Sequence, residues 1–146
     1  MKKNIIQFIG LAVFISFISI TISFTGCSGG KQTSTNTTLE GLEWELEALN
    51  GRIVADTNGN KVTLILNNGT GKMSGSSTCN KYFGGYKVDG STLSFSGLGS
   101  TKMMCDEMSI ETEYFSALSR VDKYEITNEK LKLYRGSKVI LKYKKK

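Results

Sequence analysis

The chain has 146 residues, of which 19 are basic and 13 acidic, so its net charge is +6 at neutral pH. It contains no histidine, which excludes Ser-His-Asp and Cys-His catalysis and removes the commonest metal ligand. It also contains no proline, so glycine, asparagine and aspartate must form its turns. The basic residues are not interleaved with an aromatic platform, so nucleic acid is not predicted as a partner.

The N-terminal region has the layout of an export signal. Lys2 and Lys3 precede an uncharged, apolar run from Ile5 to Phe24. The run ends in Phe24-Thr25-Gly26-Cys27, which resembles the lipobox of bacterial lipoproteins. In such proteins the cysteine receives a diacylglyceryl group and the preceding peptide is removed. The alternative is an uncleaved transmembrane helix, which would also leave the rest of the chain outside the cytoplasm.

The lipobox resemblance implies the organisation of the chain. Residues 1–26 would be a lipoprotein signal peptide, and Cys27 would carry the lipid. Beyond Cys27 the sequence is rich in Ser, Thr, Gly, Asn and Gln up to residue 38, so we interpret residues 27–38 as a flexible tether. Residues 39–146 are enough for one folded domain. The expected location is the bacterial cell envelope, and the outer membrane or periplasm in a Gram-negative cell.

Alternating apolar and polar residues predict strands through most of this domain. Asn-Gly, Asp-Gly and Asn-Glu pairs supply turns between them. The expected strands are 42–47, 61–67, 70–76, 82–88, 91–96, 123–127, 130–135 and 138–143, with a further extended segment at 100–105. One helix is expected near residues 107–120, with Phe115, Leu118 and Val121 as its apolar stripe.

This pattern predicts a mainly β fold (a β-rich α+β domain). The architecture would be a small antiparallel sheet of about eight strands, curled or closed into a barrel, with one inserted helix. Trp44, Tyr82, Tyr86 and Phe95 are expected to fill its core. The lysines at 142 and 144–146 are interpreted as a solvated, frayed terminus, and attraction to anionic lipid headgroups is the alternative.

The cysteines can be sorted by compartment. If Cys27 is acylated, Cys79 and Cys105 remain as a pair in an oxidising environment. We favour a disulfide, which would close a loop of about 27 residues and contribute roughly 3.5 kcal/mol. Two buried thiols are the alternative. Two sulfurs without an imidazole do not suit zinc, so no metal site is predicted.

Two clusters in the middle of the chain carry a family resemblance. The first consists of Gly75, Cys79-Asn80 and Gly85-Tyr86, and the second is Thr101-Lys102-Met103-Met104-Cys105. With the later Glu113, Phe115 and Leu118, they resemble the META domain, also called the HslJ-like family. Trp44-Glu45-Leu46, Leu49-Asn50-Gly51 and the last strands also fit, so the resemblance covers Leu39 to Tyr143. The chain departs from the family at Thr78, where glycine is usual, and at Met104, where alanine is common.

The resemblance implies a small, mostly β domain of an envelope protein, similar in outline to lipid-binding pilot lipoproteins. The family is associated with heat shock, novobiocin resistance and, in some parasites, motility or virulence, and no enzymatic reaction is established for it. It also implies structural roles for the motif residues Gly75, Asn80, Tyr86, Thr101 and Met103.

Several methionines and aromatic residues of this region suggest a further hypothesis. Methionine-rich surfaces adapt to apolar partners. An apolar cleft could therefore be lined by Tyr82, Phe83, Met103, Met104 and Met108, and core packing of these side chains is the alternative.

We therefore expect a lipid-anchored envelope protein whose non-catalytic META domain serves as a binding or stress-protection module. The alternative is an envelope chaperone or pilot-like lipoprotein that binds an apolar ligand or partner segment. An enzyme is not predicted, because Asp106, Glu107 and Glu111 are interpreted as complements of a helix dipole. We expect a monomer held at the membrane by the lipid on Cys27, with an envelope protein or an apolar ligand as partner and no cofactor.

Overall fold

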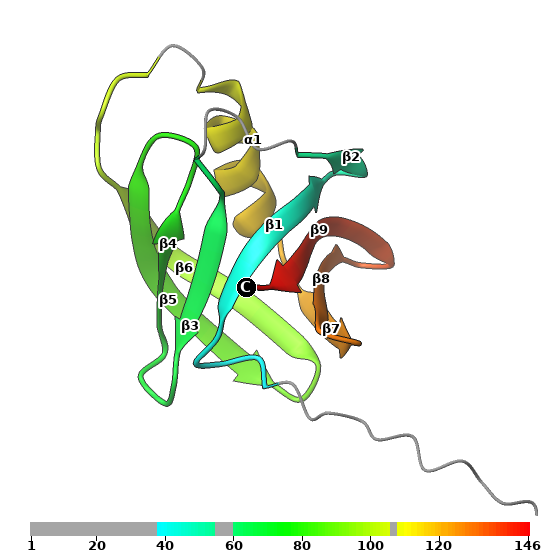
Figure 1. Ribbon diagram of the computed structural model, residues 1–146. Coiled ribbons are helices and arrows are strands. Elements are labelled where there is room, and N and C mark those ends of the chain that lie inside the picture. The colour runs from blue at the N-terminus through cyan, green and yellow to red at the C-terminus, as the bar shows by residue number, and fades with distance from the viewer. Residues whose placement is uncertain (1–37, 55–59, 106–107) are drawn as a thin grey trace, which may run out of the picture. The chain divides into compact units, whose positions relative to one another are not determined.

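A computed structural model describes residues 38–54, 60–105 and 108–146 of the protein (Figure 1). The predicted signal peptide, Cys27 and the tether up to residue 37 lie outside the described residues, as do Asp106 and Glu107. The described residues form one compact unit, and their buried core side chains all lie between Leu39 and Tyr143. This unit therefore contains a complete core of its own.

None of the helices in the described ranges has the length and apolar character needed to cross a membrane.

The described residues contain nine antiparallel strands in one sheet and one helix, which confirms the predicted mainly β class. The helix α1 is Ser109–Leu118. The strands are β1 (Glu43–Leu49), β2 (Arg52–Ile53), β3 (Thr63–Asn67), β4 (Lys72–Ser76), β5 (Lys81–Asp89), β6 (Thr92–Ser100), β7 (Lys123–Thr127), β8 (Lys130–Arg135) and β9 (Lys138–Lys145).

The sheet curls into a ring because its first and last long strands meet. The strand order is β2-β1-β3-β4-β5-β6-β7-β8-β9, and β9 also pairs with β1 (Figure 1). In that pairing Trp44 lies opposite Lys145 and Leu49 opposite Leu141. The contact between β6 and β7 is much shorter, with one registered pair, Thr92 and Lys123.

The expectation of a frayed C-terminus is wrong. The lysines at 142 and 144 alternate with Leu141 and Tyr143, which are fully buried. This alternation makes the tail a half-buried strand rather than a solvated end. The Nζ atom of Lys144 also lies 3.2 Å from Glu45 Oε1, so the tail is held to β1 by charge as well as by the ladder.

The core fills the ring, and α1 lies against one end of it (Figure 1). Trp44, Tyr82 and Tyr86 are buried as predicted, whereas Phe95 is only partly buried. The indole N–H of Trp44 donates to the carbonyl of Leu39 at 3.0 Å, which ties the start of the domain to β1.

A chain of buried hydroxyl groups crosses this core. The hydroxyl of Tyr82 donates to the carbonyl of Thr63 at 2.6 Å and lies 2.6 Å from the hydroxyl of Tyr114. Tyr114 in turn lies 3.0 Å from the hydroxyl of Tyr143. If each hydroxyl donates to the next, in the order Tyr143, Tyr114, Tyr82 and Thr63, every proton is used. The polar atoms of three large rings are therefore satisfied without water.

The predicted apolar stripe is right for Leu118 and Val121, which are buried, but the helix also buries residues that were not predicted. Its buried side chains are Glu111, Tyr114, Ala117 and Leu118, whereas Phe115 is only partly buried. Tyr114 is needed inside because its hydroxyl links Tyr82 and Tyr143. Phe115 packs edge-on against Tyr82, with ring centroids 5.4 Å apart.

Candidate functional site

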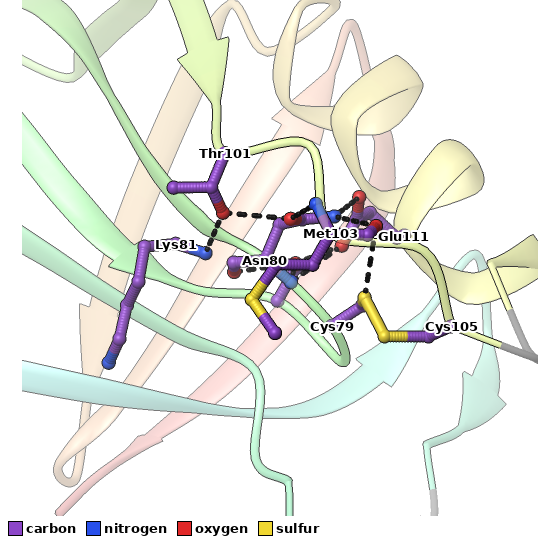
Figure 2. The surroundings of a disulfide bond; sticks show 8 residues. Cys79, Asn80, Lys81, Thr101, Met103, Cys105 and Glu111 are labelled. Atoms are coloured by element: carbon purple, nitrogen blue, oxygen red, sulfur yellow. Dashed lines mark hydrogen bonds between the residues drawn. A yellow bond between two sulfur atoms is a disulfide. The ribbon is translucent and has the colours of Figure 1, made fainter.

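The site begins at the tight turn between β4 and β5. The backbone N–H of Ser77 donates to the carbonyl of Asn80 at 2.7 Å, and the N–H of Asn80 donates to the Ser77 hydroxyl at 2.9 Å. This closed turn buries Asn80, whose side chain is directed toward residues 101–103 and the first turn of α1 (Figure 2).

The side chain of Asn80 clamps the segment after β6. Its Oδ1 accepts from the Thr101 hydroxyl at 2.7 Å and from the Met103 N–H at 2.8 Å. Its Nδ2 donates to Glu111 Oε1 at 2.8 Å and lies 3.4 Å from the Met103 carbonyl. One buried amide therefore joins the β4–β5 turn, the segment after β6 and the helix (Figure 2).

The carboxylate of Glu111 completes this clamp. It accepts from the side chain and backbone of Asn80 and from the Ser77 hydroxyl. Burial acts to raise the pKa of Glu111, but hydrogen bonds from Ser77, Asn80 and Cys79 together outweigh it and lower the pKa below its ordinary value. No lysine or arginine of the described residues lies within ion-pair distance of it. Hydrogen bonds alone hold the buried charge, so its interpretation as a dipole complement was incomplete.

A disulfide fixes the same segment from the other side. Cys79 and Cys105 are bonded, with their Cα atoms 6.1 Å apart (Figure 2). This confirms the favoured pairing over the alternative of two free thiols. We call residues 101–105 the methionine loop and Asn80, Ser77 and Glu111 the Asn80 clamp. The loop has no regular secondary structure, although the sequence predicted an extended segment there.

The methionine loop presents apolar side chains to solvent. Met104 is 96% exposed, Met103 is 61% exposed and Met108, just before α1, is 40% exposed. The backbone of Met103 is nevertheless held by Asn80. The loop is thus an exposed apolar surface on a fixed support.

The predicted apolar cleft is wrong in part. Tyr82 is buried inside the ring and cannot line a surface cleft with the others. Phe83 is the next residue along the same strand, so its side chain points to the opposite, outer face, where it is 61% exposed. Strand alternation therefore separates Tyr82 and Phe83, and the exposed methionines form a surface instead of lining a cleft with Tyr82.

Two motif residues have clear packing roles. A Cβ atom on Gly75 would lie 2.0 Å from the carbonyl oxygen of Thr63 and 2.6 Å from the Tyr82 hydroxyl, so only glycine fits where that phenol crosses β4. The hydroxyl of Tyr86 donates to the carboxylate of Glu40 and also lies 3.0 Å from the carbonyl oxygen of Asn67. Burial, together with Glu40, raises the pKa of Tyr86 to about 12.

Two hollows lie away from the methionine loop. The larger, of about 670 Å³, is lined by residues at the start of the domain, in β5 and β7 and in the β3–β4 and β5–β6 turns, and includes Leu39, Val88, Tyr124 and Ile126. The second, of about 520 Å³, lies along β4–β6 beside Phe83. We call the first the β7 hollow. Within the described residues, no group of three or more histidines, cysteines or acids is placed to hold a metal ion.

The fold and the site together define a small, ring-like antiparallel β domain that carries a disulfide-fixed apolar loop. The META domain family matches residues 37–146 of the chain, and the protein belongs to that family. This confirms the resemblance seen in the sequence.

Two solved structures show how far the likeness extends. The chain is similar to a protein from Burkholderia xenovorans solved by NMR, with 29% identity and a TM-score of 0.61, over 74% of this chain and 83% of that one. A second protein solved by NMR is 25% identical with a TM-score of 0.56, over 70% and 87% of the two chains. A search of curated protein sequences found no match.

The sequence found part of the site and missed the rest. It singled out Asn80, Thr101, Met103 and both cysteines, which the structure brings together. It did not identify Ser77, and it gave Glu111 a different role. The spacing of Glu111, Tyr114 and Leu118 could have revealed the role of Glu111, because it places all three on one face of α1. A carboxylate on a buried face needs hydrogen-bond donors around it.

Proposed function

We propose that this protein is a lipid-anchored protein of the bacterial cell envelope. In this proposal its META domain is a non-catalytic binding module that contributes to stress protection, and the methionine loop is its contact surface. The observation that carries the proposal is the exposure of Met103 and Met104 on a backbone fixed by Asn80 and the disulfide. Exposed apolar side chains held in place suit a partner surface. The lipobox-like sequence ending in Cys27 supports the anchor.

The anchor is tested by growing the source cells with labelled palmitate. We expect label on the wild-type protein and none on the Cys27→Ser variant, because the thiol is the acceptor. Ser28→Ala is the matched control and should keep the label. Label on Cys27→Ser, or none on the wild type, would refute the anchor.

The binding role is tested by complementation in the same cells. A strain lacking the protein should become sensitive to heat or to drugs that act on the envelope, and the wild-type gene should restore resistance. The Met103→Ser/Met104→Ser variant should not restore it, whereas Lys72→Ser/Lys87→Ser, on β4 and β5, should. Full rescue by the methionine variant would remove the loop as the contact surface.

The β7 hollow favours a second candidate, a carrier of an apolar ligand. Its apolar lining by Val88, Tyr124 and Ile126 suits an acyl chain. Titration of residues 33–146 with a fatty acid should then saturate, and Ile126→Asn should weaken binding about tenfold or more, since it places a polar group in the lining. Phe83→Ser, beside the other hollow, is the control. Binding that does not saturate would eliminate this candidate.

A further inference from the structure

Positive charge is concentrated in the last three strands. Residues 122–146 contain nine basic and three acidic residues, a net charge of +6, which equals the net charge of the whole chain. Residues 38–121 contain seven basic and ten acidic residues. The domain is therefore strongly polarised, with its positive charge on β7, β8 and β9.

The sheet register places many of these charges on one surface. Leu131, Leu133, Leu141 and Tyr143 point into the core and are fully buried, so the residues that alternate with them face outward. We call the outward lysines the basic face. They are Lys123 of β7, Lys130 and Lys132 of β8, and Lys142 and Lys144 of β9.

The basic face contains like charges in direct opposition. Lys130 lies opposite Lys144, and Lys132 lies opposite Lys142 across the β8–β9 ladder. Directly opposed like charges destabilise a sheet. Two such pairs side by side suit a surface that meets negative charge.

Neighbouring acids neutralise only part of this charge. Lys144 pairs with Glu45, Lys130 with Glu47 and Lys132 with Glu125, at Nζ–Oε1 distances of 3.2, 2.5 and 3.4 Å. Lys142 is exposed and has no carboxylate within ion-pair distance among the described residues. Lys123 lies 5.5 Å from the centroid of the Tyr134 ring. Five lysines thus face three glutamates, and a positive excess remains.

The start of the domain lies beside this face. Thr38 and Leu39 line the β7 hollow together with Tyr124 and Glu125, so the chain enters the fold next to β7. The 11 residues between Cys27 and Leu39 can span at most about 40 Å. A lipid on Cys27 would therefore keep the basic face close to the membrane.

We propose that the basic face binds the anionic phospholipid headgroups of the membrane that holds the anchor. The choice of membrane rests on the proposed function, whereas headgroup binding by the face needs no lipid on Cys27. A basic patch beside an acyl chain is a recognised second membrane signal. Binding through the basic face would orient the domain on the membrane. The methionine loop would stay accessible, because it lies beside Lys81 at the start of β5, whereas Thr38 lies beside Gly90 at the other end of that strand.

Single-stranded nucleic acid suits this surface less well. Its binding sites combine positive charge with aromatic rings on which bases stack. Tyr134 is the one ring among the outward residues of β7–β9, and it already contacts Lys123 and Glu125. Lysines without free rings are better matched to a lipid surface.

The test uses residues 33–146, which lack the anchor. The protein is sedimented with phosphatidylcholine vesicles that contain phosphatidylglycerol, and with vesicles of phosphatidylcholine alone. We expect binding to the anionic vesicles at low salt and its loss at high salt, because screening weakens surface electrostatics. Equal sedimentation with both vesicle types, or none with either, would overturn the proposal and would leave the palmitate test of the anchor unaffected.

Variants then locate the surface. Lys132→Gln/Lys142→Gln should weaken binding to anionic vesicles by on the order of 5-fold for each lysine removed. The thermal stability of this variant should be no lower than that of the wild type, because the change removes an opposed pair of like charges. The control Lys72→Gln/Lys87→Gln has the same net charge and lies on β4 and β5, and it should bind almost as the wild type does. Equal losses in both variants, or tighter binding to a single-stranded oligonucleotide than to the vesicles, would refute a lipid site on this face.

Discussion

Alkaline unfolding of this domain will be steep, because three buried phenols must lose their protons. Burial raises the pKa of Tyr82, Tyr114 and Tyr143 well above the ordinary value near 10. In the unfolded chain the same groups titrate near their ordinary pKa. Folded protein therefore holds protons that unfolded protein releases.

The sign of the pH dependence follows from this difference in bound protons between folded and unfolded protein. The stability that the phenols contribute is complete below about pH 10 and is lost as the pH rises through their raised values. Each phenol contributes a slope of about 1.4 kcal/mol per pH unit, so three together approach 4 kcal/mol per pH unit. That is enough to unfold a domain of ordinary stability within about two to three pH units.

Urea unfolding at a series of pH values above 9 measures this slope. Tyr114→Phe should reduce it by about 1.4 kcal/mol per pH unit, because one phenol is gone. Tyr124→Phe, which removes a hydroxyl outside the buried chain, is the control and should leave the slope unchanged. An equal slope in the wild type and in Tyr114→Phe would contradict the prediction.

Replacing Asn80 with alanine will cost about 3 kcal/mol or more in the free energy of unfolding. The variant leaves the Met103 N–H and the Thr101 hydroxyl without their acceptor, and it removes one donor from Glu111. A buried carboxylate that loses a donor is especially costly. The methionine loop should also become mobile beside the disulfide.

Urea denaturation gives the free energy, and exchange of the Met103 amide with solvent reports the loop. Asn68→Ala, on an exposed turn, is the matched control and should cost less than about 0.5 kcal/mol. Glu111→Gln should cost less in the Asn80→Ala background than in the wild type, since the two residues interact. A loss in Asn80→Ala no larger than in Asn68→Ala would show that the clamp is not a source of stability.

The strands could be predicted from sequence where their two faces differ. Leu131 and Leu133 alternate with lysines, and the bounds of β7 and β8 agree with the prediction. The helix was placed correctly, and Leu118 and Val121 are buried as predicted. Tyr114 was missed because its burial completes a chain of hydroxyl groups that forms only in the folded ring. The apolar stripe of a short helix does not reveal such a partner.

The candidate site was likewise predicted from the sequence only in part. The cysteine pair follows from the compartment expected after Cys27 is assigned. The burial of Glu111 depends on donors that lie 31 and 34 positions earlier, on Asn80 and Ser77. Contacts over such a separation are set by the fold, and a single sequence does not display them. The strand at 138–143 was predicted, but its continuation to Lys145 was missed for a related reason, because that part pairs with β1.

The pairing of β9 with β1 also sets an order of events as the chain folds. Trp44 and Lys145 lie at opposite ends of the domain sequence, and closing so long a loop is slow compared with forming hairpins. Until β9 arrives, β1 and β8 each have an open edge that another chain can pair with. The region around Cys79 and Cys105 can assemble earlier, because its contacts are nearer in sequence. The last strand therefore acts as a closing step, and the interval before it is when the chain is most exposed to misassembly.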